Sequence, residues 1–342
     1  MYGIARGKKM KIGKLPESVL IRSVLKQVHH RREDVLAGPS VGVDCAAVAA
    51  GENEVFVFSS DPITGTVKDL GSHCIHITAN DLAASGAEPV GVMLTFLFPE
   101  SLEEQELRAI MQDADRTCAE MGMEILGGHT EITACVNAPL ISVTGVGKIS
   151  RDAFLNPADI RPDQDVVVTK WIAIEGTTIL AKEREEELLQ RFSPEFVQEA
   201  RDFDRFLSVV KDAQVAVKSG VVAMHDITEG GVFGALWEIA SAGNVGLEID
   251  LKAIPIRQES VEICEFFDVN PYELMSSGSM LIVTENGEKL VSELRKAGIH
   301  SAIVGRTTDS NDRILRNGDE VRYLDKPHTD ELYRALARKK EK

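Results

Sequence analysis

The stretch Asn80–Pro89 reads Asn-Asp-Leu-Ala-Ala-Ser-Gly-Ala-Glu-Pro and joins a predicted helix to a predicted strand. The helix is expected over Leu70–Ser85 with Gly86 closing it, and its small residues at 83–85 allow close packing. The strand is expected over Val90–Phe98, which is rich in large apolar residues. This order, with an amide and a carboxylate on the late turns of the helix, is typical of an α/β protein.

The alternation of strand and helix extends in both directions from this stretch. Val55–Phe58 is β-branched and aromatic, which predicts a buried strand that ends at Ser59-Ser60-Asp61. Residues 102–121 have an amphipathic pattern that predicts a long helix, which Gly122 stops. Residues 140–147 are expected to form a further strand. Before these elements, the apolar period over residues 16–30 predicts a helix.

A change in composition at Asn156–Asp165, rich in Pro and Asp, predicts a boundary between two domains. We expect an N-terminal α/β domain over residues 14–155 and a C-terminal α+β domain over 156–338. Residues 1–13 and 339–342 are expected to be tails. The charged run 183–211 is expected to be helical and to form a solvated insertion or outer face. The other elements expected in the second half are strands at 166–169, 221–224, 247–251, 279–283 and 301–305, and helices from 177, at 231–242 and at 288–297.

The bulk properties exclude several classes of protein. The 342 residues are 44% hydrophobic with a mean hydropathy of −0.07, and no apolar run approaches the ~20 residues of a membrane span. The start of the chain lacks the apolar segment of a secretion signal. A net charge of −16 argues against nucleic acid as the main partner. The five cysteines form no CxxC pair, which favours free thiols. We therefore expect a cytoplasmic protein.

Four short acidic motifs suggest the chemistry. They are Gly42–Ala47 (Gly-Val-Asp-Cys-Ala-Ala), Ser59–Asp61, Asn80–Leu82 and His225–Gly231 (His-Asp-Ile-Thr-Glu-Gly-Gly). Mg²⁺ prefers a few carboxylates together with phosphate oxygens and water. A fifth motif, Gly127–Glu131, is expected to be a Gly-Gly turn whose bare backbone approaches phosphate oxygens. The set predicts a site that holds magnesium against a polyphosphate.

Each of these residues also has a structural interpretation that the sequence leaves open. Asp44 and Asp61 could form turns, and Asp81 could be a surface acid on its helix. Asp226 could cap the following helix, since short acids often do so. His129 could contact phosphate, act as an acid or base, or make only a structural hydrogen bond.

Together the motifs resemble the aminoimidazole ribonucleotide (AIR) synthase superfamily, which includes AIR synthase, thiamine-monophosphate kinase, selenophosphate synthetase and the hydrogenase maturation protein HypE. The resemblance runs from about Gly13 to Leu336, and the stretches Asn80–Pro89 and Met224–Ala240 are most similar to HypE. It implies a two-domain AIR-synthase-like fold, and a homodimer in which the N-terminal sheets meet. It also implies ATP and Mg²⁺ in a cleft beside the acidic motifs.

The resemblance further implies roles for individual residues. Asp44, Asp61 and Asp81 match the positions that hold Mg²⁺. The positions expected to bind the nucleotide are Asn80, Gly127, Gly128 and Thr130. Those expected to take part in catalysis are Asp226, His129 and Glu131.

This sequence departs from the family pattern at three places that bear on the expected metal site and reaction. Val43 stands where many relatives have a second acid, and His129 stands where an aspartate is usual. HypE works through a cysteine at its C-terminus, which receives a carbamoyl group. This sequence ends Lys-Lys-Glu-Lys and has its last cysteine at Cys264. The carbamoyl reaction is therefore not expected to proceed here by that route.

The function expected from the sequence is that of a Mg²⁺- and ATP-dependent enzyme, HypE-like or AIR synthase-related, which activates a substrate oxygen by phosphoryl transfer. The substrate could be a small molecule or a group borne on a protein. One alternative is a small-molecule kinase resembling thiamine-monophosphate kinase. The other is a nucleotide-binding partner protein with little turnover.

Overall fold

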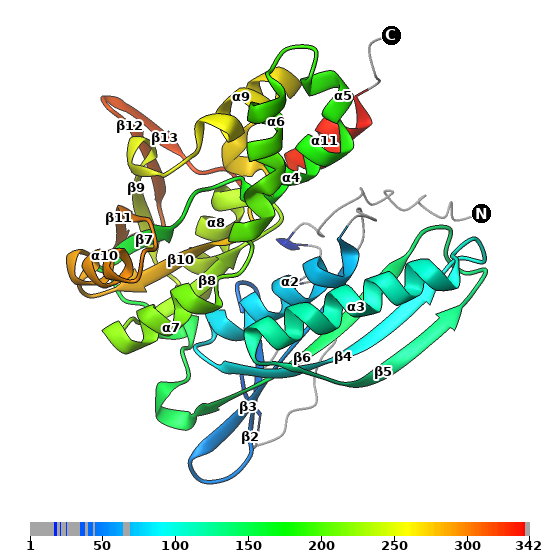
Figure 1. Ribbon diagram of the computed structural model, residues 1–342. Helices are drawn as coiled ribbons and strands as arrows, with labels where there is room; N and C mark the ends of the chain where they lie inside the picture. The colour runs from blue at the N-terminus through cyan, green and yellow to red at the C-terminus, as the bar shows by residue number, and fades with distance from the viewer. Residues whose placement is uncertain are drawn as a thin grey trace, which may run out of the picture.

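The computed structural model describes most of the chain after the first strand. The described residues are Glu17, Ser18, Ile21, Leu25 and residues 35–37, 40–43, 45–63 and 69–338. Asp44, both expected tails and most of the helix expected over 16–30 lie outside them. The described residues form two sheets, each covered by helices, with residues 151–164 passing from one sheet to the other (Figure 1).

The first sheet contains six strands in the order β1-β2-β3-β6-β4-β5. All neighbouring strands are antiparallel except β4 and β5, which run parallel and are joined by a helix that crosses over the sheet. Its elements are β1 (Val35–Ala37), β2 (Ala46–Ala49), β3 (Glu54–Ile63), α2 (Leu70–Ala84), β4 (Glu88–Phe98), α3 (Glu104–Met121), β5 (Glu124–Ile132) and β6 (Leu140–Ser150).

Helices α2 and α3 cover one face of this sheet, and no helix among the described residues covers the other face (Figure 1). In β3 the residues alternate between the two faces, as the pleat of a strand requires. Val55 and Val57 are buried, whereas Phe56 between them is 45% exposed. Met93 on β4 and Leu126 on β5 are about half exposed as well. The first half therefore has a helix-covered face and an open face with large apolar side chains.

Strand β3 is longer than the sequence pattern predicts. It continues through Ile63 because β6 pairs with it along its whole length, from Glu54 to Ile63. Asp61 therefore lies within the strand and not in a turn after it. Its position in the alternation places Asp61 on the helix-covered face, beside α2.

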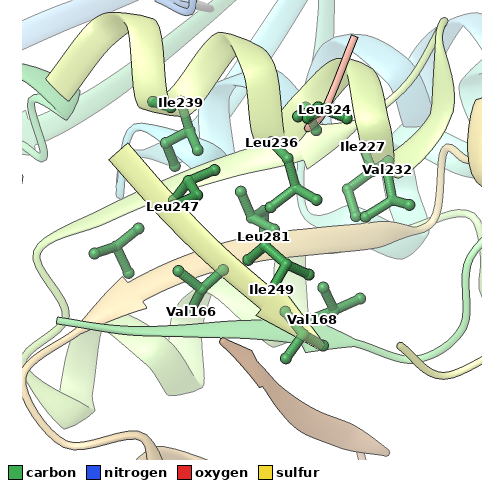
Figure 2. Close-up of a cluster of buried hydrophobic side chains, with 14 of the residues drawn as sticks. Val166, Val168, Ile227, Val232, Leu236, Ile239, Leu247, Ile249, Leu281 and Leu324 are labelled. Carbon is green, nitrogen blue, oxygen red and sulfur yellow. The ribbon is translucent and has the colours of Figure 1, made fainter. Parts of the chain in front are cut away.

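The second sheet contains seven strands in the order β13-β12-β9-β11-β7-β10-β8. Figure 2 shows how α8 packs on it: Leu236 and Ile239 of the helix point toward Leu247 and Leu281 of the strands. Its elements are β7 (Asp165–Thr169), α4 (Ile174–Glu183), α5 (Glu185–Leu188), α6 (Pro194–Arg201), η4 (Asp202–Phe206), α7 (Val210–Ser219), β8 (Ala223–Ile227), α8 (Gly231–Gly243), β9 (Gly246–Asp250), α9 (Gln258–Phe267), β10 (Ser279–Thr284), α10 (Gly287–Lys296), β11 (Ser301–Thr308), β12 (Arg313–Asn317), β13 (Glu320–Tyr323) and α11 (Glu331–Ala337).

Two features of the second half differ from the expectation. Strands β12 and β13, which the sequence pattern did not predict, follow β11 as a hairpin. The charged run 183–211 is helical, as expected, but it is not simply a solvated face, because its short helices bury Leu188, Val197 and Phe203. Apolar residues spaced among charges are enough to anchor such helices, although the charges dominate the composition.

The two halves dock through helix α2, which packs against both α7 and β8. Ala83 of α2 belongs to the same buried apolar cluster as Val209 and Met224 of the second half. Beside this cluster the amide of Asn80 donates a hydrogen bond to the Leu207 carbonyl, and its oxygen accepts one from the Val209 N–H, both at 2.8 Å. In the part of the chain that the structure describes, no helix is both long and apolar enough to cross a membrane.

Candidate functional site

The carboxylates of Asp61 and Asp81 meet at the hydroxyl of Ser59. The Ser59 Oγ lies 3.0 Å from Asp61 Oδ2 and also within hydrogen-bond distance of Asp81 Oδ2. A hydroxyl carries one proton and can donate to only one of the two at a time. Ser59 and Asp81 are buried. Two carboxylates held close together, one of them buried, are costly unless a cation neutralises them, so this pair fits a divalent metal.

The described residues on either side of Asp44 lie close to α2. The thiol of Cys45 donates a hydrogen bond to the Asp81 carbonyl oxygen at 3.2 Å. On the other side, Gly42 has a left-handed φ of 69° and contacts α8 so closely that a Cβ would collide with the Glu238 carbonyl. A side chain is therefore excluded at Gly42. Asp44 itself lies outside the described residues.

Asp226 lies on the buried strand β8 and is 2% exposed. It shares a face of the strand with Met224, which packs in one cluster with Ala83 of α2. His225 lies on the opposite face, where its Nε2 is 3.0 Å from Glu238 of α8. Asp226 is therefore on the face of β8 that meets the first half. Helix α8 begins only at Gly231 and has Gly230 as its N-cap, without a side-chain cap.

Asp330 holds the turn that follows Asp226, a role that the sequence pattern did not reveal. Its carboxylate accepts hydrogen bonds from the N–H groups of Gly230 at 2.6 Å, Met275 at 3.2 Å and Leu332 at 2.8 Å. Burial raises the pKa of Asp330 to about 7, although the three N–H groups act in the opposite direction. The only sequence signal was a short acid before a helix, which is common at an N-cap.

The residues Gly127 and Gly128 do not form a turn, so that expectation was wrong. They lie in the middle of the edge strand β5, with φ angles of 151° and 146°. A Cβ on Gly128 would collide with the Leu94 carbonyl of the neighbouring strand. The glycine is therefore required for β5 to pair closely with β4. The backbone N–H groups of the two glycines belong to an extended strand, so they do not converge on one point.

Within one chain, β5 is distant from the pair Asp61 and Asp81. Asp61 opposes Val143, Val143 opposes Leu94, and Leu94 opposes Gly128 along one row of the sheet. Three strand spacings correspond to about 14 Å. The sheet thus separates the glycines from the acidic pair.

His129 and Glu131 lie on the open face, opposite to the face that carries Asp61. They pair with Thr95 and Leu97, which alternate with the buried residues of β4. The two side chains are more than half exposed, and the His129 Nε2 lies 3.3 Å from Glu131 Oε2. A single chain therefore does not bring His129, Thr130 or Glu131 to the acidic residues, and their expected roles stay predictions.

Asn80 is fully buried, and both polar groups of its side chain bond the backbone of the second half. The structure thus gives Asn80 a role in docking the two halves, and its expected contact with nucleotide stays a prediction. Within the described ranges, no group of three or more His, Cys, Asp and Glu side chains is placed to hold a metal. Asp61 and Asp81 supply two carboxylates for such a site.

Comparison with known proteins identifies both halves. Residues 42–149 match the family described as AIR synthase related protein, N-terminal domain. Residues 161–316 match AIR synthase related protein, C-terminal domain. The two matched segments are separated by the passage from the first sheet to the second.

Among curated relatives, the chain is 26% identical to a putative hydrogenase expression/formation protein of Methanocaldococcus jannaschii, over 80% of this chain and 81% of that protein. It is 28% identical to the carbamoyl dehydratase HypE of Cupriavidus necator, over 71% of this chain and 69% of that protein.

Solved structures share the fold. A HypE–HypF complex has a chain that superposes with a TM-score of 0.72 and 21% identity, covering 90% of this chain and 99% of that chain. The hydrogenase maturation protein HypE in complex with ATP superposes with a TM-score of 0.70 and 19% identity, covering 93% and 96%.

Proposed function

This chain belongs to the family of AIR synthase related proteins, and on that premise we propose that it is an ATP- and Mg²⁺-dependent enzyme. It would transfer a phosphoryl group from ATP to an oxygen of its substrate, and so activate that oxygen for a later step. The relatives named HypE or hydrogenase expression/formation protein favour hydrogenase maturation as its process. ATP bound to a HypE of the same fold supports ATP as the nucleotide.

The observation that carries this proposal is the shared hydroxyl of Ser59 between Asp61 and Asp81. The two acids come from different elements, and Cys45, the residue after Asp44, hydrogen-bonds the Asp81 carbonyl. Asp61, Asp81 and, on its loop, Asp44 would hold Mg²⁺, which supplies positive charge to phosphate oxygens. Asp226 shares a face of β8 with Met224, which packs in one cluster with Ala83 of the same helix.

The residues of the chain then have separate tasks. Ser59 stands between the two carboxylates, with its hydroxyl within hydrogen-bond distance of both and free to donate to either one. Asp330 fixes the Gly230 turn, from which α8 starts. The N-terminus of α8 carries the positive end of a helix dipole and would favour the negatively charged phosphates. Catalysis by such a site is mainly positioning and electrostatic stabilisation.

We also propose that the enzyme is a homodimer whose open sheet faces meet. Phe56, Met93 and Leu126 are between 45% and 50% exposed on that side of the first half. Large apolar groups gathered on one uncovered face are typical of a protein–protein interface. A second copy of the chain presents the same face, so two copies can pack through it about a two-fold axis.

Titration calorimetry tests the central proposal. With Mg²⁺ present we expect ATP to bind at least ~10-fold more tightly than with EDTA, because triphosphate and clustered carboxylates repel one another. Release of ADP in the presence of Mg²⁺ would separate an enzyme from a nucleotide-binding partner protein. Equal ATP affinity with EDTA and with Mg²⁺ would contradict the proposed site.

A further inference from the structure

Thr78 of α2 has a buried hydroxyl that makes no hydrogen bond within the part of the chain that the structure describes. The residue is fully buried, and its Oγ1 has no hydrogen-bond partner there. A buried threonine on a helix usually donates to the carbonyl three or four residues before it. Thr117 of α3 donates in this way to Asp113 at 2.8 Å, and Thr178 of α4 donates to Ile174 at 3.1 Å. Thr78 therefore differs from other buried threonines of the same protein.

Thr78 packs on the first sheet next to the acidic pair. A Cβ added to Gly145 of β6 would collide with the Cγ2 of Thr78, so the methyl group of Thr78 lies directly on this glycine. Gly145 pairs with Ser59 of β3, whose hydroxyl lies between Asp61 and Asp81. Asp81 follows Thr78 by three residues, and such neighbours on a helix have Cβ atoms about 5–6 Å apart. Thr78 thus lies beside both Ser59 and Asp81.

Packing alone does not account for a threonine at position 78. Burial removes the hydroxyl from water, and without a partner nothing offsets that loss. Valine has nearly the same shape and the same branch at Cβ, and it has no polar group to bury. Leu82, which contacts the same glycine, would be an apolar neighbour for it. A buried polar group without a partner calls for an explanation, and one explanation is a partner that comes with a bound ion.

The acidic pair shares the single hydroxyl proton of Ser59. That proton can be donated to only one of the two carboxylates at a time. Carboxylates that bind a metal are in turn held by hydrogen bonds from neighbouring groups, which fix their orientation. When Ser59 donates to Asp61, Thr78 is placed to donate to Asp81 from the preceding turn of α2.

We propose that Thr78 is a positioning residue of the metal site, and that its hydroxyl donates a hydrogen bond to one oxygen of Asp81 when the other oxygen binds Mg²⁺. The inference rests on the proposed function for the metal, and on the unpartnered hydroxyl for the role of Thr78. Because the two residues are one turn apart, rotation of the short Asp81 side chain brings its carboxylate toward the hydroxyl. The hydroxyl thus gains its partner only in the metal-bound state.

Three variants of the full chain separate this role from a structural one. Thr78→Val keeps the shape of the side chain and removes the hydroxyl, whereas Thr78→Ser keeps the hydroxyl and removes the methyl group. The matched control is Thr117→Val, because the Thr117 hydroxyl is equally buried but lies within hydrogen-bond distance of the Asp113 carbonyl and the Ser72 hydroxyl.

Thermal melting in EDTA measures the metal-free state. We expect Thr78→Val to melt at the temperature of the parent or above it, because no hydrogen bond is lost and no unpartnered hydroxyl is buried. Thr117→Val should melt below the parent, because its hydroxyl has partners. A fall for Thr78→Val as large as that for Thr117→Val would show that the Thr78 hydroxyl has a structural partner, and would overturn the proposal.

The second measurement is the affinity for Mn²⁺ alone, which suits the same oxygen ligands as Mg²⁺ and is followed by its electron paramagnetic resonance signal. We expect Thr78→Val to bind Mn²⁺ at least ~10-fold more weakly than the parent, as is typical when a metal ligand loses its hydrogen-bond partner. Thr78→Ser and Thr117→Val should bind it like the parent. Unchanged affinity in Thr78→Val, or weakening in Thr78→Ser as large as in Thr78→Val, would overturn the proposal. If Thr78→Val does not fold, Thr78→Ala compared with Thr78→Ser gives the same test.

ATP binding, measured by calorimetry with Mg²⁺ and with EDTA on the same proteins, separates this inference from the proposed function. If Mg²⁺ raises the ATP affinity of the parent but Thr78→Val binds Mn²⁺ like the parent, the inference fails and the proposed function stands. If Mn²⁺ affinity depends on the Thr78 hydroxyl but Mg²⁺ does not raise ATP affinity, the inference stands and the proposed function fails. A parent that binds neither Mn²⁺ nor ATP with Mg²⁺ would contradict both.

Discussion

Asn80 and Val209 belong to different halves of the chain, and the side-chain oxygen of Asn80 accepts a hydrogen bond from the Val209 N–H at 2.8 Å. The same side chain donates to the Leu207 carbonyl. One residue of α2 thus satisfies two backbone groups of the second half. Since α2 also carries Asp81, the contact fixes the position of the acidic pair relative to Asp226.

Asn80→Ala should destabilise the whole protein by about 2–4 kcal/mol, because it leaves two buried backbone groups without partners. We expect a lower melting temperature in a single transition. Asn137→Ala, at an exposed position, is the matched control and should melt like the parent. An Asn80→Ala protein as stable as the control would show that the contact contributes little.

Asp81→Asn should lower ATP turnover by at least ~10-fold while the fold is retained, since it removes charge but keeps size and polarity. Steady-state ADP release measures the effect, and circular dichroism checks the fold. Asp115→Asn, on the exposed side of α3, is the control for the loss of one negative charge. Turnover equal to that of the control would rule out Asp81 as a metal ligand.

Asp330 should make stability depend on pH. The pKa of its carboxyl is about 7 in the folded protein, against an ordinary value of 3.8. Between these values the folded protein keeps a proton that the unfolded chain has released, so stability falls as the pH rises from about 4 to 7. The upper limit of this loss is about 4 kcal/mol.

Asp330→Asn removes this ionisation, and we therefore expect its stability to change less between pH 5 and pH 8 than that of the parent. The variant should be the less stable at pH 5, because an amide cannot accept from Gly230, Met275 and Leu332 at once. The gap should narrow by pH 8. Asp325→Asn, an exposed acid nearby, serves as control. A gap that stays constant with pH would contradict the assignment.

Met93→Lys should separate the proposed homodimer, since it places a charge on the open apolar face. Light scattering should then report the monomer mass of 37.4 kDa for the variant and twice this mass for the parent. Tyr323→Lys, at an exposed position of the second half, should remain dimeric. A parent protein that is already monomeric at micromolar concentration would contradict the prediction.

The sequence predicted those elements whose limits are set by local residues. Helix α2 ends where Gly86 follows it, and α3 ends at Gly122 in a left-handed conformation. Both stops were visible in the sequence because glycine favours such ends. Motif resemblance predicted the two-domain fold of the AIR synthase family, and the family matches and shared folds confirm it.

The features that the sequence did not reveal depend on distant partners. The extension of β3 to Asp61 is decided by β6, more than 80 residues later. Gly128 was assigned to a turn because a Gly-Gly pair is typical of turns, but the approach of Leu94 determines its conformation. Asp330 bonds Gly230 across 100 residues. Local pattern carries no information on such pairings, which only the fold brings together.

Helix α2 is enclosed on several sides, and its backbone amides are therefore expected to be among the last in the first half to exchange with solvent. Twelve of its fifteen residues are buried, between the first sheet, α3 and the second half. Its backbone amides can therefore exchange with deuterium only when both halves come apart, whereas those of the edge strand β5 can exchange in smaller fluctuations. The slowest-exchanging amides of the first half should then lie on α2.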